Sequence, residues 1–269
     1  VTFVNTPALG YIHYKTLLRL HNTDLKKEKE IIALLAKNEN IRWVVSCSGK
    51  WDINFSILAR NPEEFTKIYR EIEKKIGDYI REKSISTLIK SPGLTKGYLL
   101  GQLGTKVRSY GKKEIEKEID LVDKKILKSI SQSARKNVVE IAREIGSTID
   151  IVRYRLRKLE ENEVINGYTL QLGFDNIDIL RYSVFFTLRK MSDEIEKRMF
   201  NFAQKHNNIV FMLTMIGNYD LSLEFEVSSY HDLEHIIKNF REEFAENIND
   251  FEIIFNTEEY KYDFYPFKI

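Results

Sequence analysis

The sequence of 269 residues has little cysteine, proline or glycine, with one, four and twelve residues respectively. Its single thiol, Cys47, cannot form an intrachain disulfide, which is typical of a protein from a reducing compartment. No apolar run approaches the roughly 20 residues that a membrane-spanning helix needs, and no secretory signal is visible. We therefore expect a cytoplasmic, well-folded α+β protein.

The formal net charge of +2 conceals an uneven distribution of charged residues. Residues 1–105 carry 17 basic and 11 acidic side chains, residues 106–160 carry 15 and 9, and residues 161–269 carry 10 and 20. The net charges of the three segments are therefore +6, +6 and −10. An excess of cations in the middle segment is what a phosphate-contacting module requires, whereas the acidic last segment is not expected to contact nucleic acid.

Residues 119–172 form the most informative stretch, which predicts three short helices followed by a strand. Apolar residues recur at helical spacing in each of the three helical segments. Asn137 and Glu140 predict a capping box at the start of the second helix, and Gly146 predicts its end. Ser147 is expected to cap the third helix, so that the second and third helices form a helix-turn-helix.

The third predicted helix has two chemically different faces. Val152, Leu156 and Leu159 fall in a narrow stripe at 100° per residue, which predicts that they face a small core. Cations, a phenol and short polar groups on the other side suit a major groove. The predicted base-edge contacts are Ser147, Asp150, Tyr154 and Arg157. The predicted phosphate contacts are Arg153, Lys158, Arg135 and Lys136. The alternative is a helical bundle with a solvated charged face.

An internal repeat brackets this stretch. The segment from Ile41 to Asp52 aligns with the segment from Ile209 to Asp220, at an offset of 168 residues that holds without gaps over a long span. Each copy predicts the order strand-helix-strand-strand-helix-strand, which is the ferredoxin-like arrangement. Two helices then cover one face of a four-stranded sheet, and we expect the other, apolar face to pair with another sheet.

The middle stretch resembles the winged helix-turn-helix of the Lrp/AsnC family of transcription regulators. The matching features are Asp123-x-x-Ile126-Leu127, Ile141-Ala142, Ile145-Gly146-Ser147, Arg155-Leu156-x-x-Leu159-Glu160 and Val164-Ile165-x-Gly167-Tyr168. One departure is Glu163, where the family usually has glycine. The resemblance implies that the flanking copies are effector-binding RAM domains, which dimerise through their sheets. We therefore expect an α+β protein with two ferredoxin-like RAM-type domains flanking a winged helix-turn-helix domain, as a homodimer or higher oligomer.

The expected domain limits follow from these signals. Residues 1–90 are the first RAM-type domain, residues 91–118 a linker, residues 119–172 the winged helix-turn-helix and residues 173–269 the second RAM-type domain. The first four residues align with the wing, which suggests that a winged helix precedes them in a longer parent protein, although a genuine single-winged protein is the alternative. The aromatic stretch from Glu259 is expected to be an extra strand or arm that packs on a neighbour.

The repeated turns are the candidate effector site. Glycine lets the backbone bend and expose amide donors to a ligand carboxylate, while aspartate could bind an amino group. The family resemblance implies that amino-acid effectors bind near this turn, between neighbouring RAM domains. The predicted effector-binding residues are Gly49, Trp51, Asp52, Gly217, Tyr219 and Asp220. The alternative is a structural β-turn in which the aspartate caps its own loop.

Other chemical constellations are weak. His231 and His235 have a spacing compatible with a metal on a helix, but no third ligand accompanies them, so we predict no metal and no cofactor. Siroheme decarboxylases resemble the same architecture, so an enzyme is one rival interpretation, although the histidines are few and scattered. A ligand sensor that does not bind DNA is another. The predicted partners are double-stranded DNA and a possible amino-acid effector, without a membrane or a catalytic site.

Overall fold

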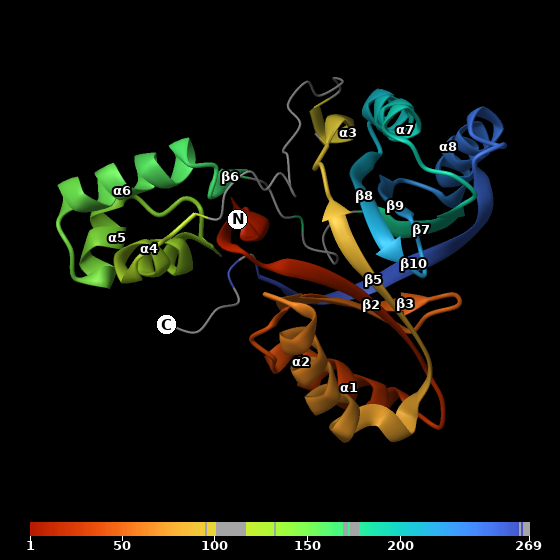
Figure 1. The fold of residues 1–269 in the computed structure, drawn as a ribbon, viewed down its shortest axis with the longest axis horizontal. Coiled ribbons are helices and arrows are strands. Elements are labelled where there is room, and N and C mark those ends of the chain that lie inside the picture. The colour runs from red at the N-terminus through yellow and green to blue at the C-terminus, as the bar shows by residue number, and fades with distance from the viewer. Residues whose placement is uncertain are drawn as a thin grey trace.

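The computed structural model has a mixed α/β fold (Figure 1). It describes residues 1–94, 96–100, 117–131, 133–168, 172, 178–263 and 265. The elements form two similar halves joined in one barrel, and a separate helical unit to one side of it (Figure 1). Within the described residues, no helix is both long and apolar enough to cross a membrane.

The first half contains four strands and two long helices. Its elements in chain order are β2 (Ile12–Leu20), α1 (Leu25–Lys37), β3 (Ile41–Ser48), β4 (Ile53–Ala59), α2 (Pro62–Ile76) and β5 (Ile80–Lys90). Polar caps begin both helices: the side chains of Asp24 and Asn61 accept hydrogen bonds from first-turn amides at 2.7 and 2.8 Å. The strands lie in the order β3-β4-β2-β5, and the helices cover one face.

The second half repeats this order. Its elements are β7 (Leu180–Leu188), α7 (Asp193–Lys205), β8 (Ile209–Gly217), β9 (Leu221–Val227), α8 (Tyr230–Glu243) and β10 (Ile248–Tyr262). Each of the four strands begins 168 residues after its counterpart, as the sequence repeat predicts. The strand order β8-β9-β7-β10 is equivalent to that of the first half.

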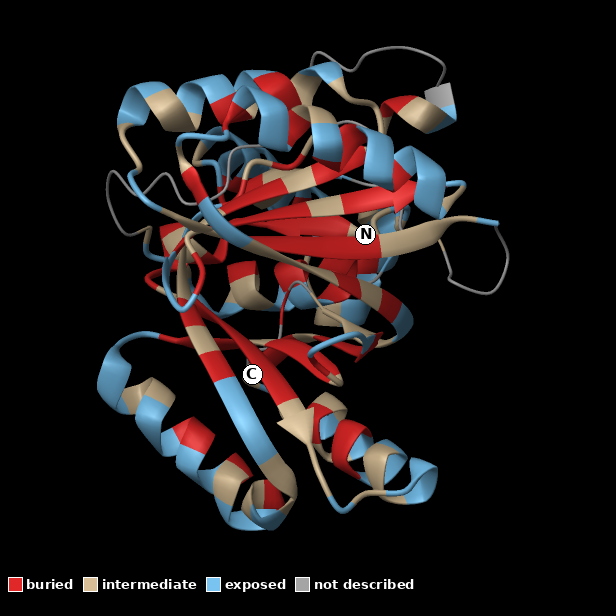
Figure 2. Cartoon of the chain, turned by 90° about the vertical axis from the view of Figure 1, so that its right-hand side faces the viewer, coloured by how far each residue is buried: buried red, intermediate tan, exposed pale blue. Residues whose placement is uncertain are grey.

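The two sheets join edge to edge into a closed eight-stranded barrel. Strand β5 pairs with β8 at one seam, and β10 pairs with β3 at the other, both antiparallel. Buried residues line the strands, while the outer sides of the helices are exposed (Figure 2). Each half has its own core between sheet and helices, and a further cluster joins Leu17 and Val45 of the first sheet to Phe185 of the second within one chain.

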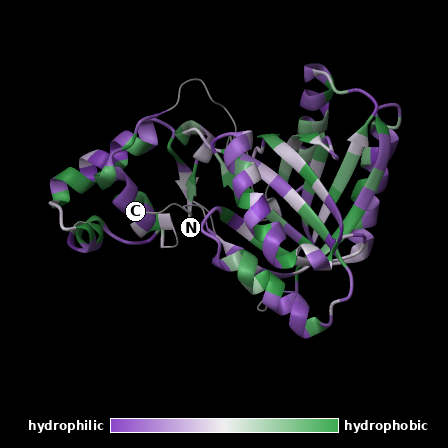
Figure 3. Ribbon diagram, turned by 60° about the horizontal axis from the view of Figure 1, so that its bottom comes forward, coloured by the Kyte–Doolittle hydropathy of each residue, from purple (hydrophilic) through white to green (hydrophobic). Residues whose placement is uncertain are grey.

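The helical unit contains α4 (Leu121–Ser131), α5 (Val138–Ile145), α6 (Ile149–Glu161) and strand β6 (Ile165–Tyr168). Strand β1 (Thr2–Val4) pairs antiparallel with β6, so the N-terminal residues complete the two-stranded sheet of this unit. Hydrophilic and hydrophobic residues alternate around its helices (Figure 3), and the apolar sides enclose a core of their own. Short helices η1 (Thr6–Leu9), η2 (Gly77–Tyr79) and α3 (Gly97–Leu100) complete the described elements.

Three local predictions were wrong in detail. The N-cap of α6 is Thr148 rather than Ser147, and its hydroxyl accepts from the amide of Ile151 at 3.3 Å. Strand β10 is much longer than the predicted last strand of the repeat. The start of the aromatic stretch at Glu259 continues β10 and pairs with β3, so it packs on its own chain.

Much of the predicted linker, residues 101–116, lies outside the described residues, as do residues 169–171 and 173–177. The described start of the linker follows the barrel instead. Gly93 bridges to Phe211, and the amide of Leu94 donates to Val210 at 2.9 Å.

Candidate nucleic-acid interface and interior cavity

Helix α6 presents one buried and one exposed face, as its sequence pattern predicts. Val152 and Leu159 are buried in the core of the helical unit. Tyr154 is 62% exposed, and Arg157 and Lys158 are exposed beside it. Among the described residues, four of the eleven large hydrophobic side chains that are markedly exposed lie on α5 and α6: Val139, Ile149, Ile151 and Tyr154. This surface therefore combines cations with apolar groups, which can contact phosphates and base edges respectively.

Local sequence signals hold α5 and α6 in place. The side chain of Asn137 accepts from the amide of Glu140 at 3.0 Å, and the Glu140 carboxylate accepts from the amide of Asn137 at 2.9 Å, which is the predicted capping box. Gly146 ends α5 in the left-handed conformation with φ +68°, as predicted. A tight turn with φ +56° at Glu163 follows α6, and the family usually has glycine there.

Not every predicted phosphate contact is equally available. Lys136 donates to Glu144 at 2.6 Å and to Ser129 at 3.3 Å, so this ammonium already has partners within the unit. Arg153 is paired with Asp150 at 3.0 Å, but both side chains are strongly exposed. Arg135 and Lys158 are also exposed.

Arg155 has a positioning role that the sequence did not reveal. Its guanidinium lies 2.8 Å from the Asp120 carboxylate and 3.3 Å from that of Asp123. Burial raises the pKa of Asp123, whereas hydrogen bonding from the Asp123 amide, together with the nearby guanidinium, lowers the pKa of Asp120. This cation therefore bridges two carboxylates and fixes α6 against the start of α4.

The aromatic side chains of the two predicted effector turns meet inside the barrel, although Gly49 and Gly217 themselves are exposed. Trp51 and Tyr219 occupy equivalent positions of the repeat, and the indole Nε1 donates to the phenol oxygen at 2.9 Å. Both side chains are buried, and both also contact Glu252. Burial, together with the hydrogen bond to that carboxylate, raises the pKa of Tyr219. These aromatic groups therefore link the first half to the second by a direct hydrogen bond.

The carboxylates and glycines of these turns also have structural contacts. Asp52 accepts from the amide of Leu20 at 2.6 Å, and Asp220 accepts from that of Leu188 at 2.7 Å. Gly49 and Gly217 have φ values of +131° and +146°, which favour glycine. The effector site that the sequence predicts at these turns stays a prediction, since each residue also supports the barrel.

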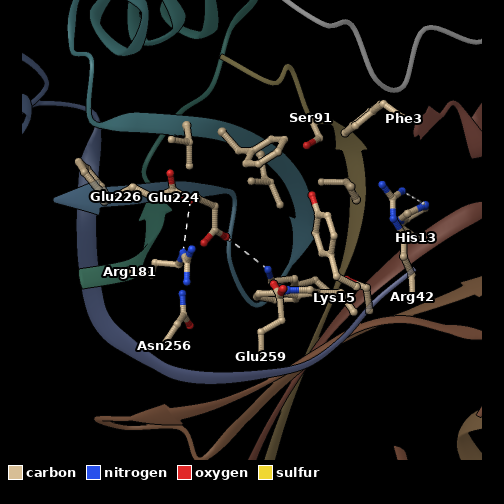
Figure 4. Close-up of a pocket in the computed structure, with 18 of the residues that line it drawn as sticks. Phe3, His13, Lys15, Arg42, Ser91, Arg181, Glu224, Glu226, Asn256 and Glu259 are labelled. Atoms are coloured by element: carbon tan, nitrogen blue, oxygen red, sulfur yellow. Dashed lines mark hydrogen bonds and ion pairs between the residues drawn. The ribbon is translucent and has the colours of Figure 1, made fainter. Parts of the chain in front are cut away.

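An interior cavity of about 180 Å³ lies in the barrel (Figure 4), and its lining includes Phe3 and Leu172 from segments that lead to the helical unit. We call this region the hollow end; the residues that define it here are His13, Lys15, Arg42, Trp43, Arg181, Glu224 and Glu226. Sequence reasoning missed it and described the histidines as scattered. Strand β2 carried a signal for it. His13 and Lys15 lie at alternate positions on the same face as Leu17, so this face of the strand has polar groups next to an apolar one.

The charged groups of the hollow end form a network across the two halves. Lys15 lies 3.3 Å from Glu224, and its ammonium is 4.2 Å from the centre of the Trp43 ring. Glu226 accepts from Arg181 at 3.4 Å. At the other side, His13 contacts Arg42 at 3.4 Å (Figure 4).

His13 is neutral in this environment. Burial lowers its pKa well below the usual value, and the nearby cations Arg42 and Lys15 lower the pKa further. Its Nε2 atom lies 2.6 Å from the Thr6 hydroxyl. The imidazole therefore contributes hydrogen bonding to the hollow end rather than charge.

Comparison with known proteins places the helical unit in a defined class. Residues 119–166 match the family described as winged helix-turn-helix DNA-binding. HTH-type transcriptional regulator LrpA of Pyrococcus horikoshii is 32% identical over 124 residues, which are 45% of this chain and 84% of the relative. An uncharacterized HTH-type transcriptional regulator of Pyrococcus abyssi is 28% identical over 122 residues, covering 45% and 80%.

The helical unit thus defines a DNA-binding protein of the winged helix-turn-helix class. The identity and coverage shared with LrpA go further: the chain belongs to the Lrp/AsnC family of transcriptional regulators.

A solved structure resembles the whole chain in fold. The siroheme decarboxylase NirDL, in complex with an iron-uroporphyrin III analogue, has a TM-score of 0.64 and covers 99% of this chain and 80% of its own. Its sequence identity is 11%, so the similarity concerns the fold alone.

Proposed function

We propose that this chain is a sequence-specific DNA-binding transcription regulator that reads the major groove with α6. The supporting observation is the exposed face of that helix, where Tyr154, Arg157 and Lys158 lie opposite the buried Val152 and Leu159. A helix of this kind fits the major groove, in which each base pair presents a distinct pattern of donors, acceptors and methyl groups.

The proposed contacts divide into two groups. Tyr154 and Arg157 contact base edges, with Asp150 and Ser147 nearer the start of α6. Arg135 and Lys158 contact phosphates, because Lys136 is paired with Glu144 and Arg153 with Asp150 in the DNA-free chain. A two-fold operator needs a second winged helix, which a second copy of the chain would supply.

A selection of bound genomic fragments at two salt concentrations, followed by affinity measurements on the enriched site, tests this proposal. Arg157→Ala and Tyr154→Ala should each cost about 1–3 kcal/mol of binding free energy and relax specificity at one position. Lys158→Ala should weaken binding to all sequences alike and reduce the salt slope by about one. Lys83→Ala, which removes an exposed cation of β5, is the matched control. Unchanged binding by all three α6 variants would contradict the proposal.

We also propose that a small effector modulates binding, either at the Gly49 and Gly217 turns or elsewhere in the barrel. The fusion of two halves into one barrel supports this idea, since a ligand held between them can change how they pack. Titration of the DNA complex with the common amino acids, followed by fluorescence anisotropy, would identify an effector of the class that the family resemblance implies.

One observation favours a second candidate, a tetrapyrrole decarboxylase. The hollow end brings His13, Lys15, Arg42 and Arg181 together, in a fold similar to that of a siroheme decarboxylase. Its volume of about 180 Å³ is below the range of about 300–1,000 Å³ typical of pockets for larger ligands, so the regulator is preferred. An intense visible absorption band that persists after siroheme is added and excess is removed would support the enzyme instead.

A further inference from the structure

The barrel interior has two chemically different ends. One end is filled by apolar groups that include Leu17, Val45 and Phe185. The hollow end retains a cavity and buried charged groups. Burying a charge is costly unless it has compensating partners, so apolar residues would fill this end at a lower cost in free energy. A barrel that needed only stability would pack both ends alike. The difference therefore points to a binding role for the hollow end.

The repeat makes the difference more specific. At the packed end, two equivalent pairs of residues 168 positions apart keep their apolar or aromatic character: Leu17 with Phe185 and Trp51 with Tyr219. At the hollow end they do not: Lys15 corresponds to Ser183, and Ser56 to Glu224. The ion pair between Lys15 and Glu224 at the hollow end therefore has no counterpart in the repeat.

The lining indicates the class of ligand. Its walls are mainly apolar and aromatic, with Trp43, Phe211 and Phe225 among them. Among the described residues that line it, the cations and carboxylates number four and three, an excess of one positive charge when the imidazole is neutral; they are Lys15, Arg42, Lys96, Arg181, Glu224, Glu226 and Glu259. We propose that the hollow end binds a small aromatic molecule that carries one carboxylate, with Arg42 and Lys15 as the carboxylate partners. A guanidinium is suited to this role because its planar fork matches a carboxylate.

The same cavity is lined by residues of three connections between the barrel and the winged helix. Phe3 comes from the strand that pairs with the wing, Lys96 follows β5, and Leu172 precedes β7. Glu226 joins two of these connections: it accepts from Lys96 at 2.6 Å and pairs with Arg181, which donates to the carbonyl of Leu172 at 2.9 Å. A ligand in the cavity therefore contacts residues of these connections, and a carboxylate bound by Lys15 competes with Glu224 for the ammonium. This regulatory consequence, unlike the binding site itself, rests on the proposed DNA-binding function.

The binding site is tested on the full chain by calorimetric titration with phenylacetate and, as a neutral match, phenylacetamide. Phenylacetate should bind saturably, with one site per chain and a Kd below about 1 mM. The Kd of phenylacetamide should be higher by roughly tenfold or more. Arg42→Met should weaken phenylacetate binding by a similar factor, while Lys83→Met, on the exterior of β5, should leave it unchanged. Equal binding of acid and amide, or no saturation by either, would overturn the proposal.

A second variant guards against loss of folding. Ser91→Phe places a ring in the cavity, so it should abolish binding while retaining the circular dichroism spectrum of the parent chain; retention of full affinity by a folded Ser91→Phe chain would overturn the assigned location. The DNA affinity is then measured with and without phenylacetate. Acid binding without any DNA binding would leave this site intact and refute the proposed function. DNA binding without acid binding would refute this site and leave the proposed function intact.

Discussion

Gly217 provides the sharpest test of how the two halves join. It is the last residue of β8 and pairs with Ser86 of β5 at one seam of the barrel. A methyl group added there would lie 2.5 Å from the carbonyl oxygen of Ile85 and 2.7 Å from the Cα of Ser86, both backbone atoms that cannot move aside alone. Gly49 is its equivalent at the other seam, where the nearest atom to an added methyl is the carbonyl oxygen of Ile253 at 3.1 Å.

The expected magnitudes follow from these distances. Both glycines have positive φ values, and a side chain in such a conformation costs about 1–3 kcal/mol. At Gly217 the collision with backbone adds overpacking of about 1–3 kcal/mol. Gly217→Ala should therefore lower the free energy of unfolding by about 4 kcal/mol and Gly49→Ala by about 2 kcal/mol. Gly77→Ala, where the nearest atom is a flexible side-chain carbon at 3.5 Å, should be neutral or slightly stabilising.

Urea unfolding followed by tryptophan fluorescence measures these differences, because Trp43 and Trp51 both lie in the barrel. A Gly217→Ala chain within about 1 kcal/mol of the parent would refute the reasoning, since the seam would then not be packed as described. A larger loss for Gly49→Ala than for Gly217→Ala would refute it equally, because it would reverse the order of the two distances.

Three further predictions concern the rest of the chain. Glu163→Gly should stabilise the winged helix by about 0.5–1 kcal/mol, because glycine accepts the positive φ at this turn; hydrogen exchange in α6 would detect the change, and faster exchange would contradict it. Burial raises the pKa of the Cys47 thiol, so iodoacetamide at pH 8 should leave the folded chain unlabelled and label it in urea; rapid native labelling in mass spectra would contradict this expectation. Ile151 and Tyr154 are 46% and 62% exposed, so replacing individual thymines of a selected operator by deoxyuridine should weaken binding of the parent chain but not of an Ile151→Ala, Tyr154→Ala double variant. Equal losses in both chains would remove these residues from the readout of thymine methyl groups.

The sequence was most informative where structure depends on neighbouring residues. The capping box at Asn137 and the C-terminal glycine at Gly146 are local signals, and both predict the observed ends of α5. The repeat was equally readable, because its offset can be counted along the chain. The cap of α6 was assigned one residue early, since Ser147 and Thr148 both have a hydroxyl that can accept from the first turn.

The seams and the hollow end could not be predicted, because they depend on residues far apart in the chain: Ser86 pairs with Gly217 at one seam and Phe255 with Ser48 at the other. Strand β10 belongs to the second half and β3 to the first, and nothing in the pattern of either strand identifies its partner. The cavity is lined from both halves and from the segments between them, so His13 and Arg181 look isolated in the sequence. The polar residues on β2 were a local indication that the inward face of this strand is not entirely apolar.

The Lys15–Glu224 pair explains why two unlike halves share one barrel. Each residue replaces a serine of the other half, Ser183 and Ser56, so each half alone has only one member of the pair. Two copies of the first half would bury two lysines without a carboxylate opposite, which is strongly unfavourable, so the pair favours joining unlike halves. Glu224→Gln should accordingly lower the free energy of unfolding by about 3 kcal/mol, because Lys15 is then buried without its anion. Adding Lys15→Met should recover most of that loss, since an apolar group of similar shape needs no partner. If the double variant is less stable than Glu224→Gln alone, Lys15 stabilises the barrel without its anion, and the selection of unlike halves must come from other contacts.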